Sequence, residues 1–186
     1  MSIKLIDGSK DSEKPGKVQP VNFQALASEQ GAEWRAICIK SLQRAGFTEI
    51  QTELHFPDVG ITIDIAAMNQ AGISLAIECK GSMMGDRPGS KRTDTVLKAI
   101  GEAFLLSQSA AAAHFPPMLL MTSHIAKVKA ARAMLGAVPV SIIADVLNPY
   151  NHAKRIAWWA SASEREIMAH MERYARVEEL LTKWDC

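Results

Sequence analysis

The sequence lacks the features that mark several large classes of protein. Its three cysteines, Cys38, Cys79 and Cys186, are widely spaced and odd in number, so they indicate neither a disulfide framework nor a zinc site and fit a reducing compartment. The richest apolar stretch, residues 110–121, contains a histidine and two prolines and is too short to span a bilayer. The first residues do not resemble a signal peptide, because charged residues soon follow Met1. We therefore expect a cytoplasmic protein with no membrane partner.

A strong charge bias is also absent. The 21 basic and 20 acidic residues leave a net charge of +1, so any phosphate-binding surface must come from a local cluster of basic side chains. No glycine-rich strand-to-helix motif for phosphate is present. The 186 residues, 48% of them hydrophobic, are enough for one domain with a substantial core. We expect a flexible arm over residues 1–21, where apolar periodicity is weak, and a single domain over residues 22–186.

The clearest pattern predicts a β-hairpin over residues 61–81. Both arms alternate apolar and non-apolar residues, which is typical of strands with one face in a core. The two apolar sets must share that face, so the loop needs an odd number of residues. Gln70-Ala71-Gly72 provides such a loop, closed by glycine in the left-handed conformation. The residues expected on the core face are Ile61, Ile63, Ile65, Ile73, Leu75 and Ile77.

This register places Asp64 directly opposite Glu78 on the other face, with Lys80 two residues further along. Opposed side chains on paired strands have Cβ atoms about 4.5–5.5 Å apart, and like charges there are destabilising. A divalent metal ion would relieve the repulsion, because carboxylates supply hard oxygen ligands. The small neighbours Ala66 and Ala76 leave room above this face. The alternative is an ordinary solvated strand face.

These residues resemble the core of the PD-(D/E)xK nuclease superfamily, which has the restriction-endonuclease-like fold. The resemblance lies in Asp64, thirteen intervening residues, and Glu78-Cys79-Lys80 at the end of an apolar strand. It implies an α/β fold with a central mixed β-sheet flanked by helices, in the order α-β-β-β-α-β-α-β over about residues 28–146. It implies a metal-dependent DNA endonuclease in which Asp64, Glu78 and the backbone carbonyl of Cys79 bind Mg²⁺ or Mn²⁺. Lys80 would assist the water that attacks the phosphodiester.

Two further acids lie before the hairpin. A helix is expected over Ser28–Ala45, and members of the family often carry a glutamate on this helix that assists metal binding; Glu33 is the better match to it. An acid near the start of a helix is also favoured by the helix dipole alone. A strand is expected over residues 47–56. Asp58 is a rival for the first acid of the motif, but Pro57-Asp58-Val59-Gly60 is typical of a turn, so we prefer Asp64.

A basic segment follows the hairpin. Residues 82–90 are rich in glycine, methionine and proline, which predicts a mobile loop. Over residues 87–98, four basic residues stand against one acid, and such a cluster suits contact with DNA phosphates. A solvated loop is the alternative, and Lys98 and Glu102 could simply pair on a helix. The basic residues are Arg87, Lys91, Arg92 and Lys98.

That helix is expected to begin with Thr93 or Asp94 as its cap and to end near residue 108. Its apolar residues predict a buried side, which resemblance to the family would place beside the active site. The residues expected to be buried are Leu97, Ile100, Phe104 and Leu105.

The rest of the chain predicts strands over residues 118–122 and 138–146, joined by a helix over residues 125–135, hence a parallel pair. Residues 147–186 are a helical extension that the resemblance does not cover. Residues 148–159 interleave basic and aromatic side chains, as nucleic-acid-binding segments do, although paired tryptophans more often mark a core or a homodimer interface. A capping box, Ser163-x-x-Glu166, opens a final helix expected to continue to Trp184.

Two other functions remain open from the sequence. One is a nucleic-acid-binding or assembly subunit that keeps the fold without the chemistry. The other is an α/β domain that binds a small anion through Lys80 and the basic segment.

Overall fold

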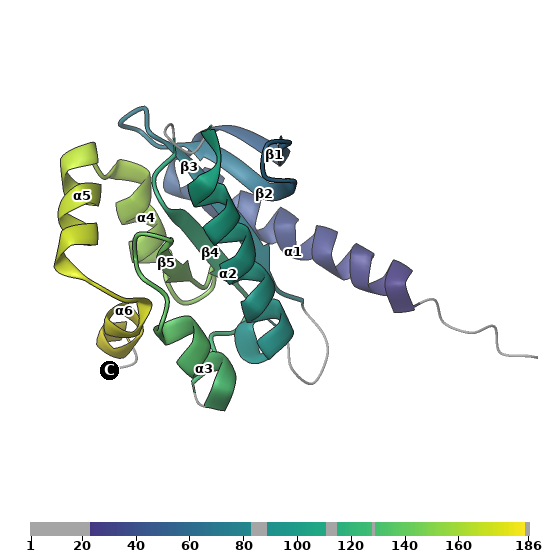
Figure 1. The fold of residues 1–186 in the computed structure, drawn as a ribbon. Helices are drawn as coiled ribbons and strands as arrows, with labels where there is room; N and C mark the ends of the chain where they lie inside the picture. Colours follow the sequence, from purple (N-terminus) through teal and green to yellow (C-terminus); the bar gives the residue numbers. More distant parts are fainter. Residues whose placement is uncertain (1–22, 83–88, 111–114, 128, 185–186) are drawn as a thin grey trace, which may run out of the picture.

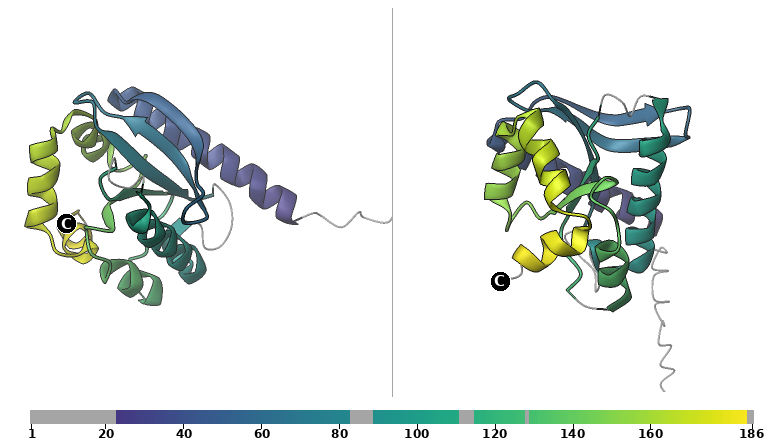
Figure 2. Two further views of the ribbon diagram at one scale, coloured as in Figure 1. Left: turned by 45° about the horizontal axis from the view of Figure 1, so that its top comes forward. Right: turned by 60° about the vertical axis from the view of Figure 1, so that its left-hand side comes forward.

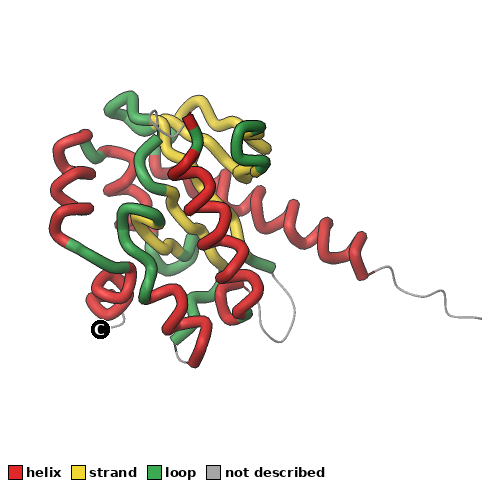
Figure 3. Tube along the Cα trace, viewed as in Figure 1, coloured by secondary structure: helices red, strands yellow, loops and turns green. Residues whose placement is uncertain are grey.

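The computed structural model describes residues 23–82, 89–110, 115–127 and 129–184, and they form a five-stranded mixed sheet between layers of helices (Figure 1). The strands are β1 (Thr48–Phe56), β2 (Ile61–Met68), β3 (Ser74–Lys80), β4 (Met118–Thr122) and β5 (Ile143–Leu147), and they lie in this order across the sheet. Figure 3 shows the strands in yellow among the helices in red. The first three strands are antiparallel, and the β3–β4 and β4–β5 pairs are parallel. The α/β class and the expected order of elements are therefore observed. The expected N-terminal arm and Arg87 lie outside the described residues.

Within these residues, three helices cover each face of the sheet (Figures 1 and 2). One layer contains α1 (Phe23–Ala45), α4 (Ala153–Ser161) and α5 (Glu164–Arg173). The other contains α2 (Thr93–Gln108), α3 (Lys129–Gly136) and α6 (Val177–Trp184). A short 3₁₀ helix, Gly89–Lys91, precedes α2. No helix in the described part of the chain is both long and apolar enough to cross a membrane.

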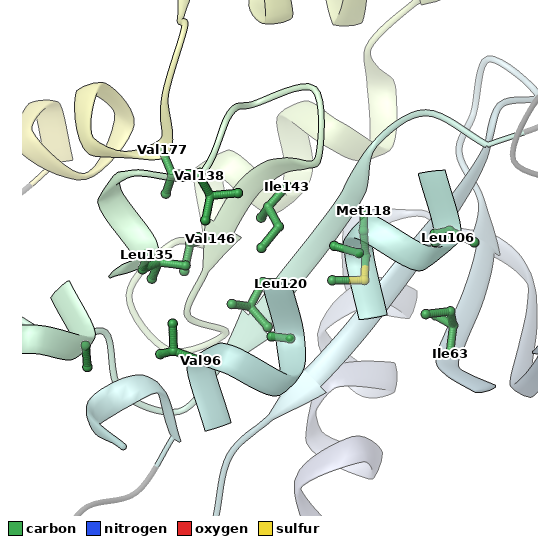
Figure 4. Packing of buried hydrophobic residues seen from close by; sticks show 14 of the residues in the cluster. Ile63, Val96, Leu106, Met118, Leu120, Leu135, Val138, Ile143, Val146 and Val177 are labelled. Carbon is green, nitrogen blue, oxygen red and sulfur yellow. The ribbon is translucent and has the colours of Figure 1, made fainter. Parts of the chain in front are cut away.

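The sheet has a hydrophobic core on each face, because its parallel strands are buried on both sides. In β4, Leu119 and Met121 pack toward α1 and α4, whereas Met118 and Leu120 pack toward α2 and α3. Figure 4 shows the second core, with Ile63 beside Leu106 of α2.

The predicted hairpin register is correct. Ile65 pairs with Ile77 and Ala66 with Ala76, the register that sets Asp64 opposite Glu78. The Asn69 N–H donates to the Ile73 carbonyl oxygen at 2.9 Å across the three-residue loop. Gly72 closes that loop with a φ of 78°, a conformation that favours glycine.

The prediction of a single core face on the hairpin is wrong. Ile65, Leu75 and Ile77 lie in the core beneath α1, but Ile61 and Ile63 lie in the core beneath α2. Nor is the second face open above its small residues, because α2 packs against it there. Ala76 is 1% exposed and lies in the same core as Val96, Ala99 and Ala103. Small residues on this face therefore allow close helix packing.

Helix α2 buries a different side from the one expected. Leu97 and Phe104 are 56% and 53% exposed, and Leu105 is also exposed. Its buried residues are Val96, Ala99, Ala103 and Leu106, and of the residues expected to be buried only Ile100, which is half-buried, packs against this core. The alanines let the helix approach the sheet closely, and this outweighs the larger apolar area of leucine and phenylalanine. Its N-cap is Arg92 rather than Thr93 or Asp94, and the Asp94 carboxylate instead pairs with the Arg92 guanidinium at 2.7 Å.

The C-terminal region differs from the prediction in two connected places. The expected final helix is broken into α5 and α6, and β5 begins at Ile143 rather than near residue 138. The Val140 N–H donates to the Ala175 carbonyl, and the Val177 N–H donates to the Val138 carbonyl. This pairing of residues 138–140 with residues 175–177 occupies backbone groups that a longer strand and a continuous helix would each need. The capping box at Ser163 and Glu166 is present as predicted.

Candidate functional site

Asp64 and Glu78 meet where the pairing of β2 with β3 ends. The final pair of opposed residues in the ladder is Ile65 and Ile77, and beyond it each acid binds the backbone of the opposite strand. The Asp64 N–H donates to Glu78 Oε2 at 3.3 Å, and the Cys79 N–H donates to Asp64 Oδ2 at 2.9 Å. The two carboxylates thus replace the next rungs of the ladder, which fixes both side chains.

Lys80 connects this pair to a third carboxylate. Its Nζ forms an ion pair with Glu78 Oε1 and lies 2.8 Å from Oε2 of Glu102, a residue of α2. Glu78 and Lys80 are nearly buried, with side chains 3% and 11% exposed. Charged side chains are rarely buried without partners. Here the Lys80 ammonium group and the carboxylates of Glu78 and Glu102 are partners of one another.

Burial sets the protonation of the cluster. Loss of solvation raises the pKa of the Glu78 carboxyl to about 8, and the charges of Asp64 and Glu102 add to this rise while Lys80 opposes it. Burial alone would lower the pKa of the Lys80 ammonium, but the carboxylates of Glu78 and Glu102 outweigh that effect and raise it. Lys80 is therefore a cation at neutral pH, and the buried Glu78 carboxyl holds a proton more tightly than an ordinary glutamate does.

Helix α1 contributes a cation on the opposite side of Asp64. Arg35 Nη1 lies 3.6 Å from Asp64 Oδ1 and 2.9 Å from Glu53 Oε1. The register of β1 with β2 sets Glu53 opposite Asp64, and Glu53 has a φ of 59°, a strained conformation for a residue other than glycine. The strained residue of β1 thus lies directly opposite Asp64. On either side of Asp64 the apolar residues of β2 belong to different cores: Ile63 lies beneath α2 and Ile65 beneath α1.

The glycine after Lys80 is required by packing. A Cβ atom on Gly81 would lie 2.5 Å from the buried indole of Trp34, which is much closer than a real contact allows. The indole therefore holds the end of β3 in place immediately after Lys80. Gly81 follows the predicted motif directly, and the structure supplies a steric reason for it.

The structure does not bring Glu33 to this cluster. Glu33 is exposed on α1, and within the described residues no hydrogen bond or ion pair joins it to Asp64 or Glu78, whereas Arg35 reaches Asp64. No group of three or more His, Cys, Asp or Glu side chains arranged to hold a metal ion occurs in the described ranges. The remaining oxygen donors are Asp64, Glu78 and the peptide of Cys79.

Those donors still fit Mg²⁺ or Mn²⁺ in kind. Mg²⁺ commonly binds through only one or two carboxylates and keeps several waters, and Asp64 and Glu78 supply two. Because the raised pKa of Glu78 means that this carboxyl holds a proton more tightly than usual, a divalent cation that binds there would compete with a proton. Asp58, the rival acid, lies in the β1–β2 turn, where it accepts hydrogen bonds from Ser109 Oγ and the Ala110 N–H.

The predicted basic residues lie along the start of α2. Lys91, Arg92 and Lys98 are exposed, but Arg92 pairs with Asp94, and Lys98 Nζ lies 3.5 Å from Glu102. Lys98 therefore approaches the same carboxylate as Lys80. Of the predicted mobile loop over residues 82–90, residues 83–88 lie outside the described residues. Gly89 and Ser90 are buried in the short 3₁₀ helix, and the Ser90 hydroxyl donates to the His124 carbonyl at 2.7 Å.

Sequence reasoning misses Arg35 and Glu102 as members of the cluster. Glu102 has a detectable signal, because it lies four residues after Lys98 on a helix expected beside the acids, but the spacing alone indicates only a pair with Lys98. Arg35 has no such signal, since its approach to Asp64 depends on the rotation of α1 about its own axis, which Trp34, Cys38 and Leu42 fix by their complete burial.

Comparison with known proteins identifies no relatives. The chain matches no model of a protein family, and neither curated proteins nor solved structures give a significant match.

Proposed function

We propose that this protein is a metal-dependent endonuclease that hydrolyses DNA phosphodiester bonds on a restriction-endonuclease-like fold. One observation carries the proposal: Asp64, Glu78 and Lys80 come together where two strands separate, and Glu78 has a pKa raised to about 8. Strongly perturbed carboxyls at such positions are typical of functional sites. Three exposed basic residues, Lys91, Arg92 and Lys98, lie at the start of α2, the helix that carries Glu102 of the cluster, and they support DNA as the substrate.

Asp64, Glu78 and the carbonyl of Cys79 are the groups that would hold Mg²⁺ or Mn²⁺. When bound, the ion would supply charge stabilisation for the phosphate and lower the pKa of a coordinated water. Glu78 would lose its proton as it becomes a ligand. Glu102 would then remain the partner of Lys80.

The environment of Lys80 favours an electrostatic role over that of a general base. Its pKa is raised, so it remains protonated at neutral pH and cannot accept a proton from water. Glu78 and Glu102 hold its ammonium group from two sides. Lys80 is therefore suited to donate a hydrogen bond to the attacking water or to offset the negative charge that develops on the phosphate.

A second function has an observation in its favour. In the structure, each acid is already engaged: Asp64 faces Arg35, and Glu78 binds Lys80. A cluster neutralised by its own cations would suit a nucleic-acid-binding or assembly subunit that no longer cuts. The same fold would then present basic residues of α2 to DNA without chemistry at Asp64. Of the three functions open from the sequence, a small-anion domain has the least support, because Lys80 is enclosed by carboxylates.

A cleavage assay separates the two functions. Supercoiled plasmid, single-stranded DNA and branched DNA would be incubated with Mg²⁺, Mn²⁺ or EDTA. We expect metal-dependent cutting that falls by at least about 100-fold in Asp64→Asn and in Lys80→Met, as loss of a charge-stabilising group commonly does. The matched control is Lys40→Met, which removes an exposed lysine from α1 and should cut like the wild type.

The outcomes are distinct. Metal-independent cutting, or full activity in both site variants, would refute the nuclease proposal. DNA binding by a folded protein that cuts no substrate would instead support the binding subunit. Circular dichroism and thermal unfolding of each variant would show whether lost activity reflects lost structure.

A further inference from the structure

A cavity lies at the β5 edge of the sheet, away from the acid–lysine cluster. It has a volume of about 460 Å³ and is enclosed by α4, α5 and α6 beside β5. Strand β4 separates β5 from β3, which carries Glu78 and Lys80. The cavity is within the range of about 300–1,000 Å³ that small-molecule sites occupy, and no group of the proposed nuclease site contributes to it.

An irregularity in β5 turns Asp145 toward this region. Met118 pairs with Ile143 but Leu119 pairs with Asp145, so Ala144 is an extra residue and forms a bulge. Bulges re-aim side chains and are common beside binding sites. Asp145, which is 1% exposed, forms an ion pair with Arg155 and accepts a hydrogen bond from Trp159 Nε1 at 2.9 Å. Asp145 thereby fixes the Arg155 guanidinium at the wall of the cavity.

Aromatic rings form another part of the wall. The ring centroids of Trp158 and His170 lie 5.1 Å apart, and the ring centroids of His170 and Tyr174 are separated by the same distance. Burial lowers the pKa of His170, and its Nε2 lies 3.3 Å from the Ala144 carbonyl oxygen. His170 is therefore a neutral ring at pH 7. Together the three side chains offer a planar ligand an apolar surface with polar edges.

Basic side chains outnumber acidic ones around the cavity. Its lining includes four cations, Lys154, Arg155, Arg173 and Lys183, against the carboxylates of Asp145 and Glu166. Both acids have partners of their own, since Asp145 binds Arg155 and Glu166 binds Ser163 in the capping box. The remaining cationic excess of two matches the charge of a phosphate monoester.

We propose that this cavity binds a nucleoside phosphate, with the base against Trp158, His170 and Tyr174 and the phosphate among Arg155, Arg173 and Lys183. Arginine and lysine are suited to phosphate oxygens, and aromatic side chains stack with every base. An inorganic anion would make no contact with the aromatic rings, and an uncharged aromatic compound would form no ion pair with the cationic side chains. The ligand source is a free nucleotide or the terminal nucleotide of a nucleic-acid strand, which share this chemistry.

Calorimetric titration of the full chain with adenosine monophosphate tests the proposal. We expect adenosine and inorganic phosphate each to bind at least about tenfold more weakly than the nucleotide, a difference of about 1.4 kcal/mol. Arg173→Ala and Lys183→Ala should each weaken nucleotide binding by about five- to tenfold. The matched control is Arg165→Ala, which removes an exposed arginine of α5 that does not line the cavity, and its affinity should be unchanged.

Two results would overturn the proposal: no binding of the nucleotide at millimolar concentration by the folded protein, or equal losses in Arg165→Ala and Arg173→Ala. Competition with a single-stranded oligonucleotide, with and without a 5′-phosphate, identifies the source. Stronger competition by the phosphorylated strand than by the free nucleotide assigns the cavity to a strand end, and weaker competition assigns it to the nucleotide. Because the readout is binding, failure of the nuclease proposal leaves this test unaffected.

Discussion

Replacement of Glu78 by glutamine should change how the stability of the protein depends on pH. The pKa of Glu78 is raised from 4.5 to about 8 in the folded protein. Between these values the folded state holds a proton that the unfolded state has released, so the free energy of unfolding must fall as pH rises. Each pKa unit corresponds to about 1.36 kcal/mol. The full penalty for ionising Glu78 is therefore at most about 5 kcal/mol, reached above pH 8.

The measurable part lies between pH 5 and pH 8.5, where the two-state linkage relation gives a fall of about 4 kcal/mol as an upper limit. Water penetration and relaxation reduce such values, so we expect about 2–4 kcal/mol. Lys80 adds no proton release of its own to the effect, because its pKa is raised above 10.5 and it stays protonated throughout this window.

Urea denaturation at both pH values would measure the effect in wild type and in Glu78→Gln. The variant should lose about 2–4 kcal/mol less than the wild type as pH rises. Glu172→Gln, at an exposed position of α5, is the control and should follow the wild type. Parallel profiles for wild type and Glu78→Gln would refute the reasoning, because Glu78 would then ionise normally in the folded state. Mg²⁺ should flatten the wild-type profile and leave the Glu78→Gln profile unchanged.

Three further predictions concern the supports of the two sites. Gly81→Ala should destabilise the protein by about 1–3 kcal/mol, because the added methyl overlaps the Trp34 indole; chemical denaturation would measure this, and an unchanged midpoint would contradict the packing argument. Glu53→Gly should be more stable than Glu53→Ala by about 1 kcal/mol, because both lose the contact with Arg35 but only glycine accepts the positive φ without strain; equal stabilities would show that no strain is stored there. Asp145→Ala should cost about 3–5 kcal/mol, since it leaves a buried guanidinium uncompensated, and a loss below about 1 kcal/mol in thermal unfolding would contradict that.

Local sequence patterns are enough to predict the hairpin and its consequences. Alternation sets the strand periodicity, and the need for an odd loop sets the register, so the pairing of Asp64 with Glu78 follows from the order of residues alone. The strand at residues 118–122 and the capping box at Ser163 are also predictable, because each depends on residues adjacent in sequence.

Helix orientation is not predictable in the same way. On α2, Leu97 and Phe104 and the smaller Ala99 and Ala103 lie on different sides, and both sets have helical spacing. The sheet selects the alanine side, since Ala99 and Ala103 let α2 pack closely on the core that contains Ala76. For the same reason the sequence does not predict that Glu102 approaches Lys80, because this contact depends on which side of α2 faces the sheet.

The sequence by itself determined the positions of most strands and helices, the register of the hairpin, and the presence of two acids and a lysine on neighbouring strands. These depend on periodicity and on turn chemistry, which act over a few residues. Tertiary structure decided the rest: the division into two cores at Asp64, the capture of Lys80 by Glu102, the approach of Arg35, and the cavity beside Asp145. Each of these joins residues distant in sequence, and burial decides both which of them meet and how they ionise.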